Sequence, residues 1–399
     1  MGIFELLASS HGRGHRFKPC TTHHKTHDVL KQALRRIPKC FFRHVHVRAV
    51  LGETKPTWLN DDISNSYGVT ILKVLITGGA GFLGLRLARA LCELDRLSMS
   101  SGQPQRIEQI VLFDHVSADL QGQDGRMRSV VGDVAIADDL YRVIGEGVDS
   151  IFHLAAVVSG QAEQDFDLGM RVNVDASRLL LEAARSSGKK PRVIFTSSVA
   201  VYGGPLPDVV TDETALFPQS SYGAQKAIGE MLLQDYSRKG FVDGRVARLP
   251  TITVRPGRPN QAASSFVSAI IREPLNGEPT HCPVTPETPV WISSPEAAIQ
   301  NLIRLHEVSA DALGSRRVVN LPGLSVTAQE MVDALRASFG ADCAQLVGWT
   351  FEQRIQNIVG TWPRSWDCTR AKALGMTQDE NFGQVIAAYA RRLNPPRIA

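Results

Sequence analysis

Three polar side chains in the middle of the chain have the types and the spacing needed for acid–base chemistry on an alcohol. Tyr222 and Lys226 stand four residues apart in the segment YGAQK, and Ser198 lies upstream at the end of the apolar run RVIFTS. Residues four apart share one face of a helix, so the lysine charge can lie beside the phenol. A positive charge favours the phenolate and brings the pKa of a tyrosine down from about 10. These residues predict a general base, Tyr222, with Ser198 holding the substrate hydroxyl.

A glycine-rich segment supplies the second chemical signal. The segment 73–84, KVLITGGAGFLG, places Gly78, Gly81 and Gly84 between an apolar run and a helical pattern that begins at Phe82. Glycine permits a sharp turn and a close approach of the backbone, and the first turn of a helix presents unpaired N–H groups. We therefore predict a turn that binds a dinucleotide pyrophosphate. The spacing G-x-x-G-x-x-G differs from the commoner G-x-G-x-x-G, and a purely structural turn is the alternative.

Alternating strand and helix patterns must position these residues. After residue 72 the alternation predicts an α/β fold with a parallel sheet and right-handed crossovers. The expected strands cover 74–76, 109–114, 130–134, 149–156 and 192–197, and the expected helices begin at 82 and cover about 162–187 and 221–238. Asn173 falls inside one of these helices. Because Asn is a poor residue for a helix interior, its side chain is expected to bond to a specific partner.

Two acids follow expected strands and are candidates for the adenosine side of the cofactor. At the carboxyl end of its strand, Asp114 can accept hydrogen bonds from a ribose diol, and its charge would repel a 2′-phosphate. This favours NAD over NADP. The positive nicotinamide ring of NAD would join Lys226 in favouring the phenolate of Tyr222. Asp133 is expected near the adenine. For Asp114, a helix N-cap or an ordinary loop acid remains an open alternative.

The charge of the 399-residue chain is unevenly distributed. Residues 1–70 carry 11 Lys and Arg against 5 Asp and Glu, whereas the rest of the chain holds 33 against 35. The body is not basic, which argues against nucleic acid as a partner. No apolar run reaches the ~20 residues of a membrane span, so no membrane contact is expected. The six cysteines show no C-x-x-C pairing, which favours reduced thiols in the cytoplasm.

Residues 1–70 are expected to be an extension of the folded body. They are basic and rich in histidine, and the α/β pattern begins only after them. We predict that this segment is disordered or is not native to the protein. An organelle presequence over 29–51 and a zinc site remain alternatives. The candidate zinc ligands, whose spacing fits no zinc finger, are Cys20, His23, His24, His27 and Cys40.

Four segments, TGGAGFLG, HLAA, TSSVAVYGG and YGAQK, resemble the extended short-chain dehydrogenase/reductase (NAD-dependent epimerase/dehydratase) family, over about residues 72–395. The resemblance implies a Rossmann-type doubly wound parallel sheet in residues 71–247. A smaller, mostly C-terminal α/β substrate domain is expected in residues 248–399, interleaved with it. Ser198, Tyr222 and Lys226 would be the catalytic residues, Asn173 would support a proton relay, and no metal would be needed. The residues implied to bind NAD are Gly78, Gly81, Phe82, Leu83, Gly84, Asp114, Asp133, Leu154, Ala155, Tyr222 and Lys226.

The segment after residue 247 indicates the substrate class. Val199 and Ala200 stand where dehydratases of the family carry an Asp-Glu pair, which argues against a dehydratase. Arg255 and Arg258 lie in a proline-rich loop that suits bidentate capture of a carboxylate. Alternatively, they form structural ion pairs or face a nucleotide diphosphate. Trp291 and Trp362 are expected to wall the pocket, and the alternative is that either one belongs to the core.

Residues 248–279 resemble the members of this family that oxidise a four-carbon sugar acid at C2. The resemblance implies oxidation of a small sugar acid with NAD, and D-erythronate is the expected substrate. The expected substrate contacts are Ser198, Tyr222, Arg255 and Arg258. Two alternatives stay open: a nucleotide-sugar 4-epimerase that returns the hydride to its substrate, and a non-catalytic NAD sensor. The helices at 163–187 and 221–238 leave a homodimer open.

Overall fold

The computed structural model of the chain describes residues 71–99, 102–257 and 262–393. The predictions for residues 1–70, including the zinc alternative, therefore lie outside the described residues. Arg258, one of the two arginines expected to bind the substrate carboxylate, also lies outside them.

The main sheet has the parallel, doubly wound architecture that the sequence predicted. Its order is β11-β7-β6-β5-β1-β3-β2, with β4 paired to the other part of β3, and every pair is parallel except β2 with β3. In chain order the strands are β1 (Ile71–Thr77), β2 (Arg96–Ser98), β3 (Pro104–Asp114), β4 (Met127–Val131), β5 (Ser150–His153), β6 (Arg192–Ser198), β7 (Asp243–Leu249) and β11 (Val318–Asn320). The α/β fold class is confirmed.

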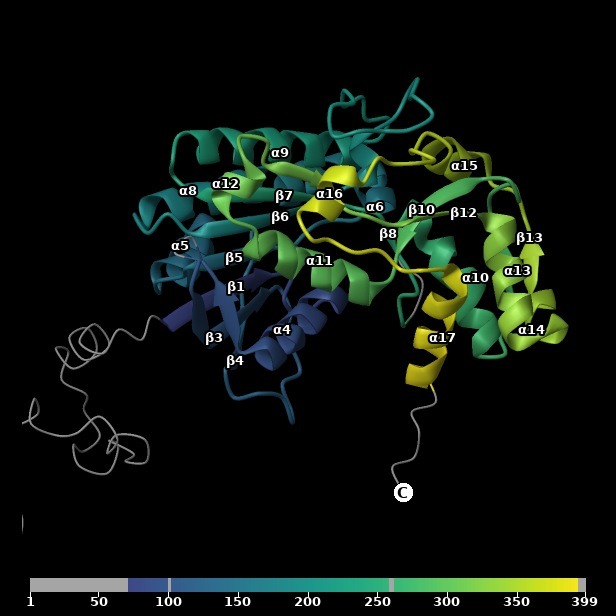
Figure 1. Cartoon of the computed structure of the whole chain (residues 1–399), viewed down its shortest axis with the longest axis horizontal. Coiled ribbons are helices and arrows are strands. Elements are labelled where there is room, and N and C mark those ends of the chain that lie inside the picture. Colours follow the sequence, from purple (N-terminus) through teal and green to yellow (C-terminus); the bar gives the residue numbers. More distant parts are fainter. Residues whose placement is uncertain (1–70, 100–101, 258–261, 394–399) are drawn as a thin grey trace, which may run out of the picture. The chain divides into compact units, whose positions relative to one another are not determined.

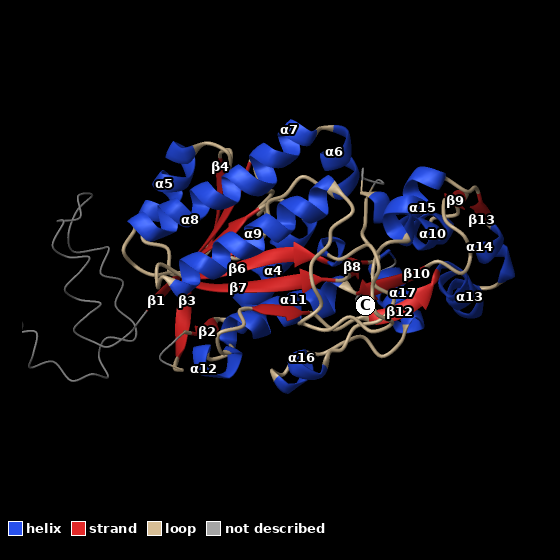
Figure 2. Cartoon of the chain, turned by 90° about the horizontal axis from the view of Figure 1, so that it is seen from above, coloured by secondary structure: helices blue, strands red, loops and turns tan. Residues whose placement is uncertain are grey.

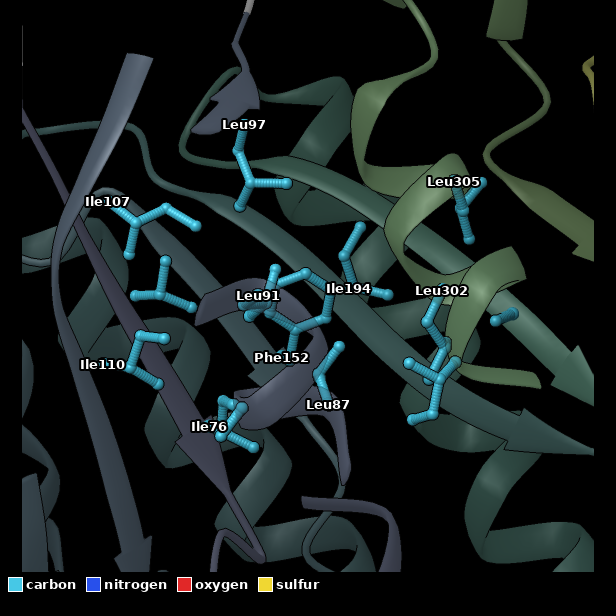
Figure 3. Close-up of a cluster of buried hydrophobic side chains, with 14 of the residues drawn as sticks. Ile76, Leu87, Leu91, Leu97, Ile107, Ile110, Phe152, Ile194, Leu302 and Leu305 are labelled. Atoms are coloured by element: carbon cyan, nitrogen blue, oxygen red, sulfur yellow. The ribbon is translucent and has the colours of Figure 1, made fainter. Parts of the chain in front are cut away.

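Helices cover both faces of this sheet (Figures 1 and 2). On one face lie α4 (Phe82–Leu94) and α11 (Pro295–Glu307), and on the other lie α5 (Ala137–Gly145), α8 (Ala176–Ser186) and α9 (Ser221–Arg238). Successive strand residues point to opposite faces, so Ile76 packs with α4 and α11, whereas Leu75 packs with α5 and α8. Figure 3 shows the first of these two buried clusters. Both faces of the strands are buried, which explains their continuous apolar sequences.

The long helix predicted over 162–187 is divided in the structure. It consists of α6 (Ser159–Gln164), α7 (Phe166–Gly169), the π-helical segment η4 (Met170–Asp175) and α8. Asn173 lies in the π-helical segment, is buried, and exchanges hydrogen bonds with the backbone of Val157 at 2.9 and 3.1 Å. Its amide also donates to Gln225 at 2.7 Å. The expectation that Asn173 bonds to specific partners is confirmed, and the irregular helix turn presents its side chain to them.

A smaller mixed sheet follows at the carboxyl ends of the main strands (Figure 2). Its order is β12-β10-β8, and a separate parallel pair joins β13 to β9. The strands are β8 (Thr251–Ile252), β9 (Thr280–Cys282), β10 (Pro289–Ser293), β12 (Leu324–Thr327) and β13 (Val347–Trp349). The accompanying helices are α10 (Phe266–Leu275), α13 (Ala328–Phe339), α14 (Ala341–Gln345), α15 (Gln353–Val359) and α17 (Phe382–Leu393), and the short α12 (Ala310–Leu313) and α16 (Thr369–Ala373) lie beside the main sheet.

Residues 248–399 contribute to both sheets, because β11 and α11 belong to the main sheet layers. The proposed boundary at residue 247 stays a prediction. Within the described ranges, no helix combines the length and the apolar character that a bilayer crossing requires.

Candidate active site

The glycine turn between β1 and α4 brings three backbone segments into close contact. Gly78 has φ +68°, and a Cβ there would lie 2.9 Å from the backbone nitrogen of Ala155. A Cβ on Gly84 would lie 2.3 Å from the carbonyl oxygen of Gly78. Gly81 caps the start of α4 without a side chain, and a Cβ there would meet only the Gly78 oxygen, at 3.1 Å. Gly78 and Gly84 therefore serve the packing of the turn, whereas Gly81 keeps the first turn of the helix accessible.

A cavity of about 290 Å³ opens beside this turn, at the carboxyl ends of β1, β5, β6 and β7. In an open parallel sheet this edge is the usual place for a ligand. The predicted residues that line the cavity are Gly78, Gly81, Phe82, Leu83, Gly84, Leu154, Ser198, Tyr222, Lys226 and Arg255. The structure thus gathers the glycine turn and the expected catalytic residues around one space.

Three of the predicted NAD contacts do not line this cavity. Ala155 packs under Gly78, and the neighbouring Ala156 lines the space instead. Asp114 ends β3 and accepts a hydrogen bond from the backbone of Ala80 in the glycine turn, at 3.0 Å. Asp133 follows β4 and bonds locally to the backbone of residue 135. Asp114 therefore lies at the turn, and the roles of all three residues toward NAD stay predictions.

Several lining residues were not predicted from the sequence. They include Val158, Ser159, Thr251, Ile252, Ala262 and Ser264. Among these six, only Ser159, a small polar residue soon after the HLAA segment, carried a local signal. Trp362 lines the cavity as expected, whereas Trp291 stacks on Trp366 with ring centroids 5.4 Å apart and is absent from the described lining.

The expected catalytic residues come from a strand end and from the start of a helix. Ser198 is the last residue of β6, and its side chain is hydrogen-bonded to the hydroxyl of Tyr222 in the first turn of α9. Ser220 caps this helix by accepting from the backbone of Gly223 at 3.2 Å. A Cβ on Gly223 would lie 2.0 Å from the oxygen of residue 200, so glycine allows the helix to begin against the loop that follows Ser198. This close approach brings Tyr222 to Ser198.

Lys226 is buried one turn beyond Tyr222. Its Nζ lies 5.8 Å from the centroid of the Tyr222 ring and 4.9 Å from that of Phe195. Only 2% of its surface is exposed, and this burial lowers its pKa to about 8, opposed by the carboxylate of Glu230. The shared helix face predicted for Tyr222 and Lys226 is confirmed.

The chain alone does not lower the pKa of Tyr222, and the predicted lowering by Lys226 together with the nicotinamide ring stays a prediction. Burial raises the pKa of Tyr222 to about 12, although the hydrogen bond from Ser198 and the charge of Arg255 act in the opposite direction. Desolvation of a phenolate in this enclosed site exceeds both favourable interactions. Arg255, which the sequence did not predict to act on Tyr222, adds a cation that favours its phenolate.

Arg255 reaches the cavity from the segment after β8. Its backbone nitrogen donates to Ser268 at 3.1 Å, and its carbonyl oxygen accepts from Arg272 at 2.8 Å, which fixes the segment against α10. Burial and the nearby Arg272 lower the pKa of Arg255, and Tyr222 opposes them. This places a guanidinium near the hydroxyl that was predicted to act as base.

The residues around the glycine turn fit a dinucleotide. The accessible start of α4 offers backbone N–H groups to a pyrophosphate, and the Gly78 and Gly84 contacts leave no room for larger residues. Within the described ranges, no three His, Cys, Asp or Glu side chains cluster in a way that could hold a metal ion.

The model of the NAD dependent epimerase/dehydratase family matches residues 74–291, more than half of the chain. The chain belongs to this family. Membership confirms the resemblance stated from the motifs, and it confirms NAD as the cofactor. The family match begins within β1 and ends within β10, so it includes the glycine turn, Ser198, Tyr222, Lys226 and Arg255.

Individual relatives within the family extend the comparison over most of the chain. The chain is 60% identical over 319 residues to a D-erythronate dehydrogenase from Cupriavidus necator, covering 80% of this chain and 98% of that protein. It is 46% identical over 318 residues to a D-erythronate dehydrogenase from Haemophilus influenzae, again covering 80% and 98%. A solved structure, a nucleoside-diphosphate-sugar epimerase from Agrobacterium tumefaciens, has a TM-score of 0.74 at 38% identity and covers 80% of this chain and 94% of that one.

Proposed function

We propose that this chain is an NAD-dependent dehydrogenase that oxidises D-erythronate at C2 to 2-dehydro-D-erythronate. The identities of 60% and 46% to two D-erythronate dehydrogenases, each covered over 98% of its length, support this substrate. Ser198, Tyr222 and Lys226 are proposed as the catalytic residues. Ser198, Tyr222 and Arg255 are proposed to contact the substrate, together with Arg258, which lies outside the described residues.

The position of Arg255 supports C2 as the carbon that is oxidised. In a 2-hydroxy acid the carboxylate is bonded directly to the carbon that is oxidised. A cation that binds the carboxylate must therefore lie beside the base that takes the C2 hydroxyl proton. Arg255 lines the cavity and acts electrostatically on Tyr222, as this geometry requires. Oxidation at the far end of a four-carbon acid would separate the two groups by the length of the substrate.

The chain's own residues would then perform the following chemistry. Ser198 holds the C2 hydroxyl in line with Tyr222, and Tyr222 takes the hydroxyl proton as the C2–O bond becomes a carbonyl. Bound NAD supplies the acceptor for the hydride that leaves C2. Lys226 is proposed to bind the nicotinamide ribose and to keep positive charge near the phenolate. Because burial holds the pKa of Tyr222 at about 12, the phenolate depends on the positive charge gathered around it.

A test measures NADH absorbance with purified protein, NAD and a panel of four-carbon sugar acids. We expect absorbance to rise with D-erythronate. Tyr222→Phe should abolish the rise while leaving NADH binding intact, because the ring remains and only the hydroxyl is lost. A flat trace with the wild type, together with interconversion of nucleotide sugars, would overturn the substrate and favour a 4-epimerase.

A homodimer is proposed as the assembly. Apolar side chains of α7 and α9 are exposed at Phe166, Ile228 and Met231, with 59%, 39% and 62% of their surfaces accessible. A second copy could cover them. Light scattering coupled to gel filtration would report the mass, and a monomer at micromolar concentration would reject the dimer.

We also propose a cytoplasmic location. Cys92, Cys282, Cys343 and Cys368, the cysteines among the described residues, are all free thiols, as expected in a reducing compartment. Cell fractionation would test it, and recovery of the protein in an oxidising compartment would reject it.

A further inference from the structure

A buried carboxylate lies one helical turn beyond Lys226. Glu230 is fully buried, and its position four residues after Lys226 puts both side chains on one face of α9. The proposed reaction does not use it directly. A buried carboxylate without a partner would be strongly unfavourable, so its surroundings indicate what keeps it charged.

Two other elements of the sheet hold the Glu230 carboxylate. Arg248, at the end of β7, donates to both of its oxygens, at 2.9 and 2.6 Å. Ser197, the residue before Ser198 on β6, donates its hydroxyl to Glu230 at 2.5 Å. The carboxylate therefore forms a bidentate ion pair and is fixed in orientation. It ties together β6, β7 and α9, which carry Ser198, the edge of the cavity and Tyr222.

The Arg248 guanidinium also has a hydrogen-bond partner besides Glu230. Its guanidinium donates to the hydroxyl of Tyr202 at 2.5 Å, and that hydroxyl donates to Asn320 on β11 at 2.9 Å. Tyr202 and Asn320 are both buried. Arg248 is thus held by partners on two sides, and the orientation of Glu230 does not depend on solvent.

We propose that Glu230 is a positioning residue whose buried carboxylate, on the same face of α9, keeps Lys226 charged beside Tyr222. The proposal rests on the proposed function, because that function assigns the ammonium of Lys226 to the reaction. Burial of Lys226 favours its neutral amine, and Glu230 is the group that opposes this tendency. Without Glu230, the lysine would lose its proton closer to neutral pH.

The other titratable and charged groups around Lys226 do not replace Glu230. His153 on β5 is buried with a pKa of about 3, so it is neutral and adds no negative charge. Tyr222 is protonated in the chain by itself. Arg248 and Arg255 are cations, and each would disfavour the lysine charge. Glu230 therefore supplies the negative charge that faces Lys226.

The test follows the ionisation of Lys226 directly, by nuclear magnetic resonance of protein labelled with carbon-13 at the lysine Cε. Lys226→Arg identifies the signal. In the wild type we expect a titration midpoint near 8. Glu230→Gln should lower this midpoint by about one unit or more, because the remaining Arg248 is then an uncompensated cation. The matched control is Asp235→Asn on the same helix, whose exposed carboxylate pairs with Arg238, and it should leave the midpoint unchanged.

Glu230→Gln leaves Arg248 buried without its carboxylate, so a second variant guards against failure to fold. The double variant Glu230→Gln/Arg248→Gln removes both charges. Its midpoint should lie between those of Glu230→Gln and the wild type, because the loss of Arg248 offsets part of the loss of Glu230. A midpoint equal to that of the wild type, in whichever of the two variants folds, overturns the proposal. The titration requires no turnover. If the wild type fails to oxidise D-erythronate, the proposed function falls while the effect of Glu230 on Lys226 is still decided.

Discussion

Gly81 and Gly84 stand three residues apart in the same turn, yet the structure gives them different tasks, and alanine substitutions should separate them. In Gly84→Ala the new Cβ would lie 2.3 Å from the Gly78 oxygen and 2.8 Å from the Gly79 Cα, both backbone atoms that cannot move independently. In Gly81→Ala the Cβ would meet only the Gly78 oxygen, at 3.1 Å, and would otherwise project into the cavity. The first change affects packing, and the second affects the space for the cofactor.

The expected magnitudes follow from these contacts. Overpacking against backbone is destabilising by up to about 3 kcal/mol. Replacing glycine by alanine inside a helix stabilises the helix by about 1 kcal/mol. Gly84→Ala should therefore lower the free energy of unfolding by about 2 kcal/mol. Gly81 lies at the N-cap with φ −72°, which alanine can adopt, so Gly81→Ala should lower it by less than about 1 kcal/mol.

The assay pairs urea unfolding with NADH fluorescence titration. Gly81→Ala should weaken NADH binding at least about tenfold, which corresponds to about 1.4 kcal/mol, because its methyl group occupies the pyrophosphate approach. Gly84→Ala should show its main effect in the unfolding free energy. The reasoning is refuted if Gly84→Ala is as stable as the wild type, or if Gly81→Ala binds NADH normally.

Three further predictions test other parts of the site. Ser198→Ala should lower the turnover of D-erythronate roughly a hundredfold with unchanged NADH affinity, because one donor to the reacting oxygen is lost. Steady-state kinetics measures the turnover, and a value close to that of the wild type would contradict this role of Ser198. Asp114→Ser should raise the ratio of NADP to NAD efficiency by removing a charge that repels the 2′-phosphate, and an unchanged ratio would place the adenosine ribose elsewhere. The free energy of unfolding of Lys226→Met should exceed that of the wild type, by the largest amount below pH 8. The unfolded lysine keeps its proton up to its ordinary pKa of 10.5, whereas the folded one loses it near 8. The free energy of unfolding of the wild type therefore rises between pH 8 and 10.5, and the difference between the two proteins shrinks. A difference that does not depend on pH would contradict the lowered pKa of Lys226.

The sequence predicted the parts of the fold and site that depend on local pattern. A buried parallel strand, a glycine turn and a helix are each encoded within a few residues, and so is the four-residue spacing that aligns Tyr222 with Lys226. The carboxyl ends of parallel strands lie at one edge of the sheet, and Ser198 and the glycine turn line one cavity there.

The parts that could not be predicted depend on contacts between distant segments. Asn173, in the π-helical turn, forms hydrogen bonds with residues 16 and 52 positions away in the sequence. The helical periodicity of the sequence does not predict this turn. The sequence gives no reason for a glycine at position 223. The reason is its contact with the backbone of Ala200, which only the structure shows.

The pKa of Tyr222 shows most clearly what local pattern omits. From spacing alone, Lys226 is the charge beside the phenol, and a lowered pKa follows. In the structure the same burial that brings the two groups together also desolvates them, and it moves both pKa values toward the neutral forms. Arg255, from the segment after β8, favours the charged form of Tyr222, and Glu230, one turn along α9, favours the charged form of Lys226. The reactive state of this site is therefore set by residues outside the motif that identifies it, and substitutions at Glu230 or Arg255 should change its chemistry while every motif residue stays in place.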